Sequence, residues 1–130
     1  LVRLTAEDGS VGLGNIDPSP GYSVETIEQS LTALREQLAP LVHGSDAGNP
    51  HQLVQRMDTA LPGYLDAKAA IEMACVDLLA RRLGIPVYQY LGGAMASSVR
   101  FNAWIGIVSP DEAAAEARRW FDRGFRSAKV

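Results

Sequence analysis

One strand, one helix and a second strand follow each other at the end of the sequence, and this order allows few folds. Residues 99–108 are rich in β-branched and aromatic side chains, which favour a strand. A capping box begins at Ser109, with proline at the first helical position, and residues 113–123 continue it as a helix that ends at Gly124. Residues 125–130 predict a second strand. Two strands joined by one helix of this length pair in parallel through a right-handed crossover, so the chain is predicted to end in a βαβ unit.

The first part of the sequence has a different pattern. Apolar and polar side chains alternate in residues 1–7, and an apolar pattern resumes in residues 11–16. Asp8-Gly9 between them is a short-range signal of a β-hairpin. Residues 15–21 contain two prolines and a glycine, which predict a loop. The sequence thus begins with a hairpin and a proline-rich connection.

Three helices are predicted after this loop. Residues 23–39 carry apolar side chains at three- and four-residue spacing, with Ser23 as the N-cap and acidic residues in the first turn. A second, shorter helix begins after Asn49, which is followed by proline. Residues 64–83 form the strongest helical segment, because a broad stripe of small and apolar side chains runs along it and Gly84 follows as a stop signal.

The best candidate for a domain boundary is Gly92-Gly93, a flexible corner at which the pattern changes. Hairpin and helices come before it, and the strand, helix, strand order comes after it. We therefore expect an α+β domain over residues 1–93 and an α/β segment over residues 94–130.

Composition and charge exclude several classes of protein. The chain has 12 basic and 15 acidic side chains, a net charge of −3 and 47% hydrophobic residues. This composition excludes a disordered chain, and without a basic cluster we expect no binding to nucleic acid or to a membrane. No apolar run is long enough to cross a bilayer, and the single Cys75 agrees with a reducing compartment. We expect a cytoplasmic protein whose partner is a small molecule or another protein.

Several residues of types that often carry chemistry have a structural interpretation here. The pair Gly12 and Gly14 lacks the third glycine and the following helix of a phosphate-binding loop. Glu72 and Asp77 lie on different faces of their helix, where we expect structural or solvated carboxylates. Two histidines expected at the surface and one cysteine expected in the core complete this group: His43, His51 and Cys75.

Four segments, taken in their order along the chain, resemble one known family. They are DGSVGLG at residues 8–14, AKAAIEMACVDLL at residues 67–79, GIPVYQYLGG at residues 84–93 and GFRSAKV at residues 124–130. The first three resemble the N-terminal part of the mandelate racemase and muconate lactonizing enzyme group of the enolase superfamily. The fourth resembles the stretch in which this group carries a Lys-x-Lys motif at the end of the second barrel strand. Together they cover almost the whole chain.

This resemblance implies a fold class. An α+β capping domain, built of a β-hairpin followed by helices, is joined to the first βαβ unit of a modified (β/α)8 barrel. Residues 1–93 would form the capping domain, with its first strand ahead of Leu1, and residues 94–130 the truncated start of the barrel. We therefore expect the chain to be a fragment of a longer enzyme. The active site of such a barrel lies at the carboxyl ends of its strands.

The resemblance also implies a reaction. The family removes the proton α to a carboxylate and stabilises the resulting enediolate with Mg²⁺, with lysine or histidine as the base. The implied enzyme is a racemase or epimerase, a cycloisomerase or a dehydratase, and therefore an isomerase or a lyase. Its partners would be a small carboxylate substrate and, in a homo-oligomer, further copies of itself.

Lys129 matches the first lysine of the Lys-x-Lys motif. Alternate residues of a strand face the same way, so both ammonium groups would enter the mouth of the barrel. Each cation disfavours protonation of the other, which leaves one lysine able to act as the base. Lys129 would be the electrostatic partner of that base. The base itself and the acidic Mg²⁺ ligands would lie beyond residue 130, so we expect no metal ligand in this chain and no activity from the fragment alone.

The loop at residues 15–22 is a candidate for substrate contact. In the family it resembles, a capping-domain loop closes over the substrate and helps to set specificity, and Asp17 and Tyr22 would then make the contacts. An ordinary proline-rich connection accounts for the same residues equally well.

Three residues near the end of the first predicted barrel strand could line the pocket: Asn102, Trp104 and Ile105. Trp104 would form an apolar wall and Asn102 would donate a hydrogen bond. Alternation along a strand allows only one set of side chains to face inward, so at most half of these residues should contact substrate. Lys129 likewise has a structural alternative, as a solvated lysine at the edge of a sheet.

A different class of function fits the same sequence. The chain could be an independent α+β module for binding or oligomerisation, with a βαβ extension and no catalysis. The next codons of the open reading frame distinguish the two hypotheses. A lysine at the first position after Val130, followed by acidic residues that end later strands, supports the enzyme, and a stop codon there excludes it.

Overall fold

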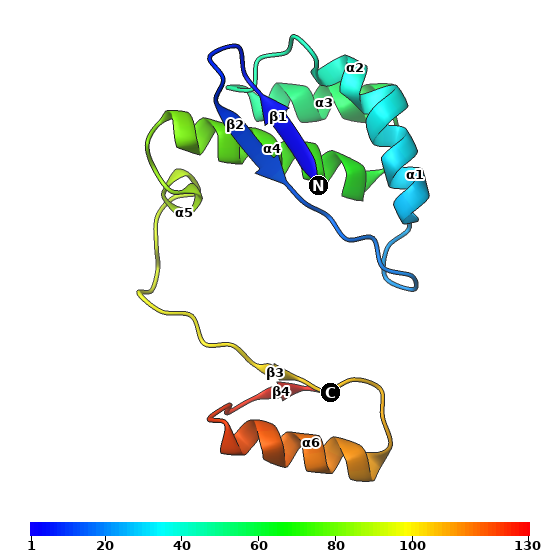
Figure 1. The fold of residues 1–130 in the computed structure, drawn as a ribbon, viewed down its shortest axis with the longest axis vertical. Helices are drawn as coiled ribbons and strands as arrows, with labels where there is room; N and C mark the ends of the chain where they lie inside the picture. The colour runs from blue at the N-terminus through cyan, green and yellow to red at the C-terminus, as the bar shows by residue number, and fades with distance from the viewer. The chain divides into compact units, whose positions relative to one another are not determined.

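The computed structural model describes residues 1–130 and separates them into two units, Leu1–Gly93 and Ala94–Val130. The first unit contains a β-hairpin and helices, and the second contains two short strands and one helix (Figure 1). No helix in either unit has the length and apolar character needed to span a bilayer.

The hairpin is built from β1 (Val2–Thr5) and β2 (Val11–Gly14), which pair antiparallel. The hairpin predicted from Asp8-Gly9 is confirmed. In its turn, the Asp8 carboxylate accepts a hydrogen bond of 3.0 Å from the Ser10 backbone N–H. Gly9 has a φ of +82°, a conformation that glycine adopts without strain.

β2 lies directly on the long helix α4 (Leu65–Arg82). A Cβ atom added to Gly14 would come within 1.9 Å of the Ala70 carbonyl oxygen. A Cβ atom added to Gly12 would come within 2.1 Å of the Ala74 carbonyl oxygen. The Leu13 backbone N–H also donates to the Asp77 carboxylate, over 2.9 Å. The structural role expected for Asp77 is thus confirmed, and the two glycines allow the close approach of β2 to α4.

The first predicted helix begins later than expected, as α1 (Ile27–Thr32). Ser23 was expected to be its N-cap, and this prediction is wrong. Thr26 caps the helix through a complete capping box with Gln29, in bonds of 3.1 Å and 2.8 Å. A capping box needs Glu or Gln three positions after the cap, which Thr26 has and Ser23 lacks.

The same helix was expected to end at residue 39, but it widens and continues. A π-helical segment, η1 (Ala33–Leu38), leads into α2 (Ala39–Val42), and the Ala39 N–H donates to the carbonyl of Leu34, five residues earlier. Pro40 explains the widening, because in a regular α-helix its ring would clash with a carbonyl group one turn back.

The other predicted helices of this unit are present. α3 (Pro50–Ala60) begins at the expected cap, since the Asn49 side chain accepts from the Gln52 N–H over 3.1 Å. α4 ends before Gly84, which has a φ of +67°. One more short helix, α5 (Val87–Tyr90), follows Pro86.

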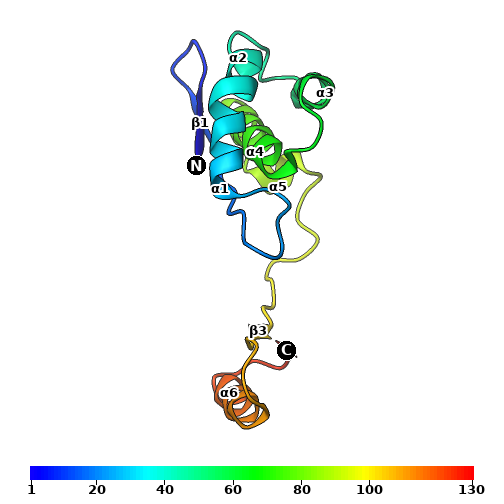
Figure 2. The same cartoon turned by 90° about the vertical axis from the view of Figure 1, so that its right-hand side faces the viewer.

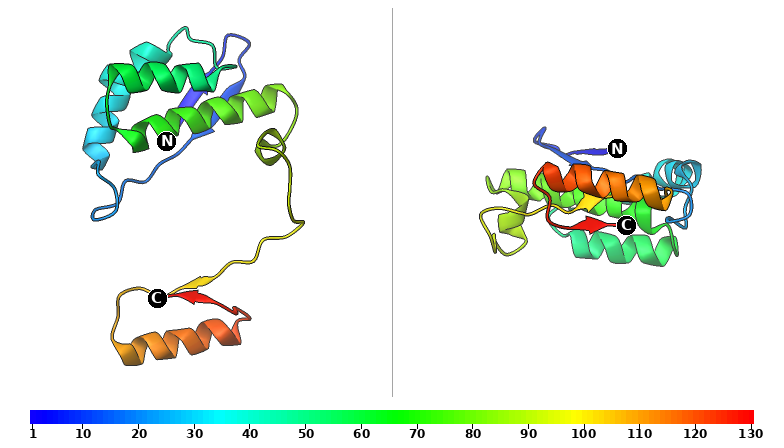
Figure 3. Two further views of the ribbon diagram at one scale, coloured as in Figure 1. Left: turned by 180° about the vertical axis from the view of Figure 1, so that it is seen from behind. Right: turned by 90° about the horizontal axis from the view of Figure 1, so that it is seen from below.

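The hairpin and α3 lie on opposite sides of α4, and α1 contacts α4 (Figures 2 and 3). Val2 and Leu4, opposite the two glycines of β2, pack against the hydrophobic core. This core takes its buried side chains from η1, α3 and α4: Ala33, Leu38, Leu53, Met57, Ala67, Ile71 and Cys75.

Cys75 is fully buried, as expected from its place on the apolar stripe of α4. Burial, with a smaller contribution from the charge of Glu72, raises the pKa of the thiol from 9.0 to about 11. At about pH 8, this shift lowers the thiolate fraction roughly a hundredfold, and the thiolate is the reactive form. We expect Cys75 in the native protein to react with a disulfide reagent at least about a hundredfold more slowly than in urea, as followed by peptide mass spectrometry. Equal rates in both states would contradict this burial.

The second unit is a βαβ unit. β3 (Ala103–Trp104) pairs in parallel with β4 (Ala128–Lys129), and α6 (Pro110–Asp122) connects them. The predicted capping box is confirmed, since Ser109 and Glu112 exchange hydrogen bonds at the start of α6. These two strands do not by themselves form a barrel, so the barrel remains a prediction.

Both strands are shorter than the predicted spans of residues 99–108 and 125–130. Phe125 completes the end of α6 instead of starting a strand, because its N–H donates to the Trp120 carbonyl over 3.1 Å. Its ring also packs edge-on against the Trp120 ring, with 5.0 Å between centroids. Residues near β3 and β4 that have no partner across the ladder stay outside the strands.

Candidate active site

Buried and exposed residues alternate along β3 and the residue after it, whereas both residues of β4 are exposed. Ala103 and Ile105 are only 3% and 2% exposed, whereas Trp104 between them is 66% exposed. α6 runs along one side of the two strands (Figure 1), and the buried residues alternate with the exposed ones as the pleat requires. The exposed face therefore contains Trp104 and its neighbours in register.

Lys129 is the residue directly opposite Trp104 across the ladder. Residues opposite each other project to the same face of a parallel pair, so both belong to the exposed face. The backbone places Lys129 firmly, since its carbonyl accepts from the Ile105 N–H over 2.9 Å. Its side chain is exposed and takes part in no ion pair of this chain. An unpaired lysine and an exposed tryptophan thus occupy opposite positions on one face of the parallel pair.

The other two candidates on this strand differ from each other. Asn102 alternates with Ala103 and so shares the face of Trp104, although its side-chain amide donates to the Ala103 carbonyl over 3.1 Å. Ile105 belongs to the opposite, buried face. The structure thus separates Ile105 from the other two, as the alternation expected from the sequence allows, and Ile105 is buried in this unit.

Asp17 and Tyr22 belong to the loop between β2 and α1, in the first unit. Tyr22 is 88% exposed, and Asp17 is exposed as well. Local hydrogen bonds shape this loop: the N–H groups of Tyr22 and Ser23 both donate to the Ser19 carbonyl, at 3.1 Å and 2.9 Å. The side chains of Asp17 and Tyr22 are therefore available for contact with another molecule.

The chain contains no group of three or more His, Cys, Asp or Glu side chains that could hold a metal ion. Mg²⁺ prefers oxygen ligands, several of them carboxylates. The residues of this chain therefore do not fit a magnesium site, and a catalytic metal would need ligands from elsewhere.

A family model described as "Mandelate racemase / muconate lactonizing enzyme, N-terminal domain" matches residues 1–92. Over all 130 residues the chain is 30% identical to an L-Ala-D/L-Glu epimerase of Bacillus subtilis, of which it covers 35%. Other relatives are named as racemases and cycloisomerases. The chain thus spans about a third of the length of the curated relatives that it matches along its whole length.

Solved structures give the same result. A 2-chloromuconate cycloisomerase from Rhodococcus opacus matches 97% of the chain with a TM-score of 0.91 and 32% identity, and the match covers 36% of that protein. A mandelate racemase/muconate lactonizing type protein from Roseovarius nubinhibens, solved with magnesium, matches 98% of the chain with a TM-score of 0.91 and 29% identity, and the match covers 34% of that protein. Both units of the chain therefore fall within the matched region.

Proposed function

The chain belongs to the mandelate racemase and muconate lactonizing enzyme family, and from this membership we propose that it is part of an enzyme that removes the proton α to a carboxylate. Residues 1–93 form the capping domain of this enzyme, and residues 94–130 form the first βαβ unit of its barrel. The product is a racemised or epimerised substrate, a cycloisomer or a dehydrated acid. The location in the cytoplasm and the homo-oligomer expected from the sequence stay predictions.

One observation supports this proposal above all others. Lys129 stands exposed and without an ion-pair partner, directly opposite the exposed Trp104 across the parallel pair of β3 and β4. Catalytic groups of (β/α)8 barrels come from the carboxyl ends of the strands, which is where the Lys-x-Lys motif that Lys129 resembles lies.

Each residue has a proposed role at the reacting atoms. The Lys129 ammonium raises the positive potential beside the base and beside the substrate carboxylate, which favours loss of the α proton. Trp104 provides an apolar wall, and Asn102 directs its second amide hydrogen to a substrate oxygen. Asp17 and Tyr22 contact the part of the substrate that differs between enzymes. The magnesium ion that the family implies would be held outside these 130 residues, so no step at this chain is assigned to it.

Hydrogen exchange at the substrate tests the function. The whole enzyme, incubated in D₂O with a panel of dipeptides, N-succinyl amino acids and muconates, should incorporate deuterium at the carbon next to the carboxylate of one class. NMR follows the loss of the α-proton signal. Absence of exchange across the panel, together with a stop codon directly after Val130, would favour the alternative, a binding or oligomerisation module.

A further inference from the structure

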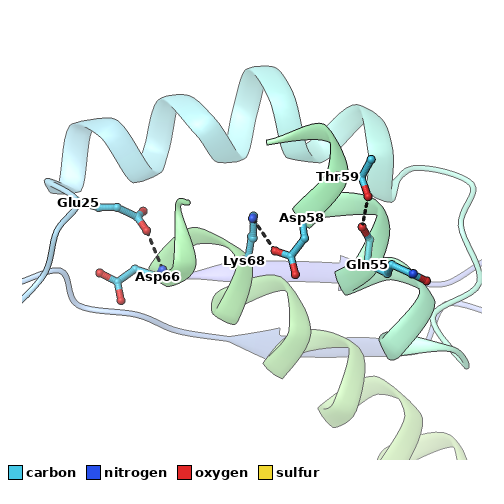
Figure 4. Close-up of polar contacts among 6 residues, drawn as sticks. All are labelled: Glu25, Gln55, Asp58, Thr59, Asp66 and Lys68. Carbon is cyan, nitrogen blue, oxygen red and sulfur yellow. Dashed lines mark hydrogen bonds and ion pairs between the residues drawn. The ribbon is translucent and has the colours of Figure 1, made fainter. Parts of the chain in front are cut away.

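The Glu25 side chain is buried, although the sequence placed it among the acidic residues in the first turn of the helix predicted over residues 23–39. It is 9% exposed and lies directly before the N-cap of α1. Figure 4 shows it reaching from the end of the loop between β2 and α1 to the first turn of α4. A carboxylate that has given up its hydration needs hydrogen-bond donors in compensation.

Three donors converge on this carboxylate. The backbone N–H groups of Asp66 and Ala67 donate to its two oxygens over 2.8 Å and 3.3 Å. The hydroxyl of Ser30, a residue only 1% exposed, donates to it over 2.5 Å. Glu25 is thus held by groups from two different helices.

α4 depends on Glu25 for its N-terminal cap. Its N-cap residue, Tyr64, has a φ of 52° and makes no side-chain hydrogen bond to the helix. The first N–H groups of a helix have no partner within the helix, and a negative charge near them is stabilising. Glu25 supplies both a partner and the charge, from 41 residues earlier in the sequence.

The loop between the two anchors is the one that carries Asp17 and Tyr22. At its start, Gly14 lies in close contact with the backbone of α4, and at its end Glu25 binds the N-terminus of the same helix. Only residues 15–24 lie between these two attachments. The loop is therefore held at both ends on one rigid helix, by close packing at the first end and by a carboxylate at the second.

We propose that Glu25 is a positioning residue for substrate binding: it fixes the C-terminal end of this loop and so holds Tyr22 and Asp17 in their binding geometry. The role toward a substrate rests on the proposed function of the loop. Without the anchor, binding must first order a freely moving segment, and the cost of that ordering appears in affinity. Lost contacts that are equal in the ground state and the transition state raise KM and leave kcat almost unchanged.

The test variant is Glu25→Gln in the whole enzyme. Glutamine has one acceptor oxygen for three donors, and its amide N–H₂ would face one of them. We expect the amides of residues 15–24, Asp66 and Ala67 to exchange with D₂O at least about tenfold faster. We expect KM to rise roughly tenfold and kcat to fall less than about threefold. Ser30→Ala, which removes one donor only, should change the same quantities in the same direction by a smaller factor.

Two control variants separate this role from general stability. Glu28→Gln removes the same charge from an exposed position three residues away and should change neither quantity. Asp58→Asn breaks the 2.7 Å ion pair with buried Lys68, which joins α3 to α4 without touching the loop (Figure 4). It should lower the melting temperature and leave KM unchanged. A merely structural Glu25 would behave like Asp58.

Each outcome decides one claim. Loop amides that exchange equally fast in Glu25→Gln and in the unsubstituted enzyme overturn the anchor, whatever the activity. Faster exchange with an unchanged KM overturns the role in substrate binding. An unsubstituted enzyme that exchanges no α proton overturns the proposed function, and with it any role toward substrate, while faster loop exchange would still support the anchor.

Discussion

Replacing Lys129 with alanine in the whole enzyme should slow exchange of the substrate α proton by about 10²- to 10⁴-fold, the range of a positioned acid–base group. The reason is electrostatic: without the Lys129 ammonium, the lysine expected two positions later holds its proton more tightly. Less of this lysine is then in its basic form near neutral pH, so the rate maximum should move to higher pH. NMR of deuterium incorporation across a pH series measures both effects.

Two further variants separate the effect of the Lys129 charge from the effect of its position in the chain. Lys129→Arg keeps a cation at the same strand position, so it should keep the pH profile and recover part of the rate. Arg126→Ala removes an exposed cation from the same segment, one that lies over the Phe121 ring at 4.7 Å, and should leave the exchange rate unchanged. If Lys129→Ala exchanges the α proton at the original rate, Lys129 has no part in the mechanism.

Elements with complete local signals were predictable from the sequence. The capping box at Ser109 and the Asn49 cap both contain donor and acceptor within a few residues, so the pattern alone specifies their geometry. The same is true of the Asp8-Gly9 turn. In each case the energy that defines the element comes from neighbours in sequence.

Features that depend on distant residues were not predictable in this way. Glu25 is buried because its acceptors meet N–H groups that follow 41 and 42 residues later. A local signal was nevertheless available: the capping box of Thr26 and Gln29 places Glu25 before the helix and not within its first turn. The same box sets the N-cap at Thr26 and not at Ser23.

In the candidate site, too, local patterns predicted one feature and distant residues determine the other. Alternation predicted that Asn102, Trp104 and Ile105 could not all face one way, but not which of them would share a face with Lys129. The pairing register decides this, since it sets Trp104 opposite Lys129 and leaves Ile105 buried. A one-residue slip would exchange the two faces. Register depends on the helix that packs against the strands, which no local pattern specifies.

The alternate glycines of β2 carry a prediction about stability. Gly14→Ala should destabilise the first unit by about 3 kcal/mol or more, because the new methyl group would meet the Ala70 carbonyl at 1.9 Å. The obstacle is the backbone of α4, which cannot rotate aside as a side chain could. Either β2 moves off the helix or the helix bends, and both separate Val2 and Leu4 from the core.

Hydrogen exchange of the α4 amides in the whole enzyme measures this effect. A loss of about 3 kcal/mol corresponds to exchange roughly a hundredfold faster, since each 1.4 kcal/mol is a factor of ten. Gly12→Ala, which would meet the Ala74 carbonyl at 2.1 Å, should have a similar effect. Gly106→Ala is the matched control: its added methyl group meets nothing closer than the Trp104 ring at 3.8 Å, so α4 should exchange at the original rate. Unchanged α4 exchange in Gly14→Ala would mean that β2 does not lie directly on the helix backbone, and the loop of residues 15–24 would then lose its first anchor.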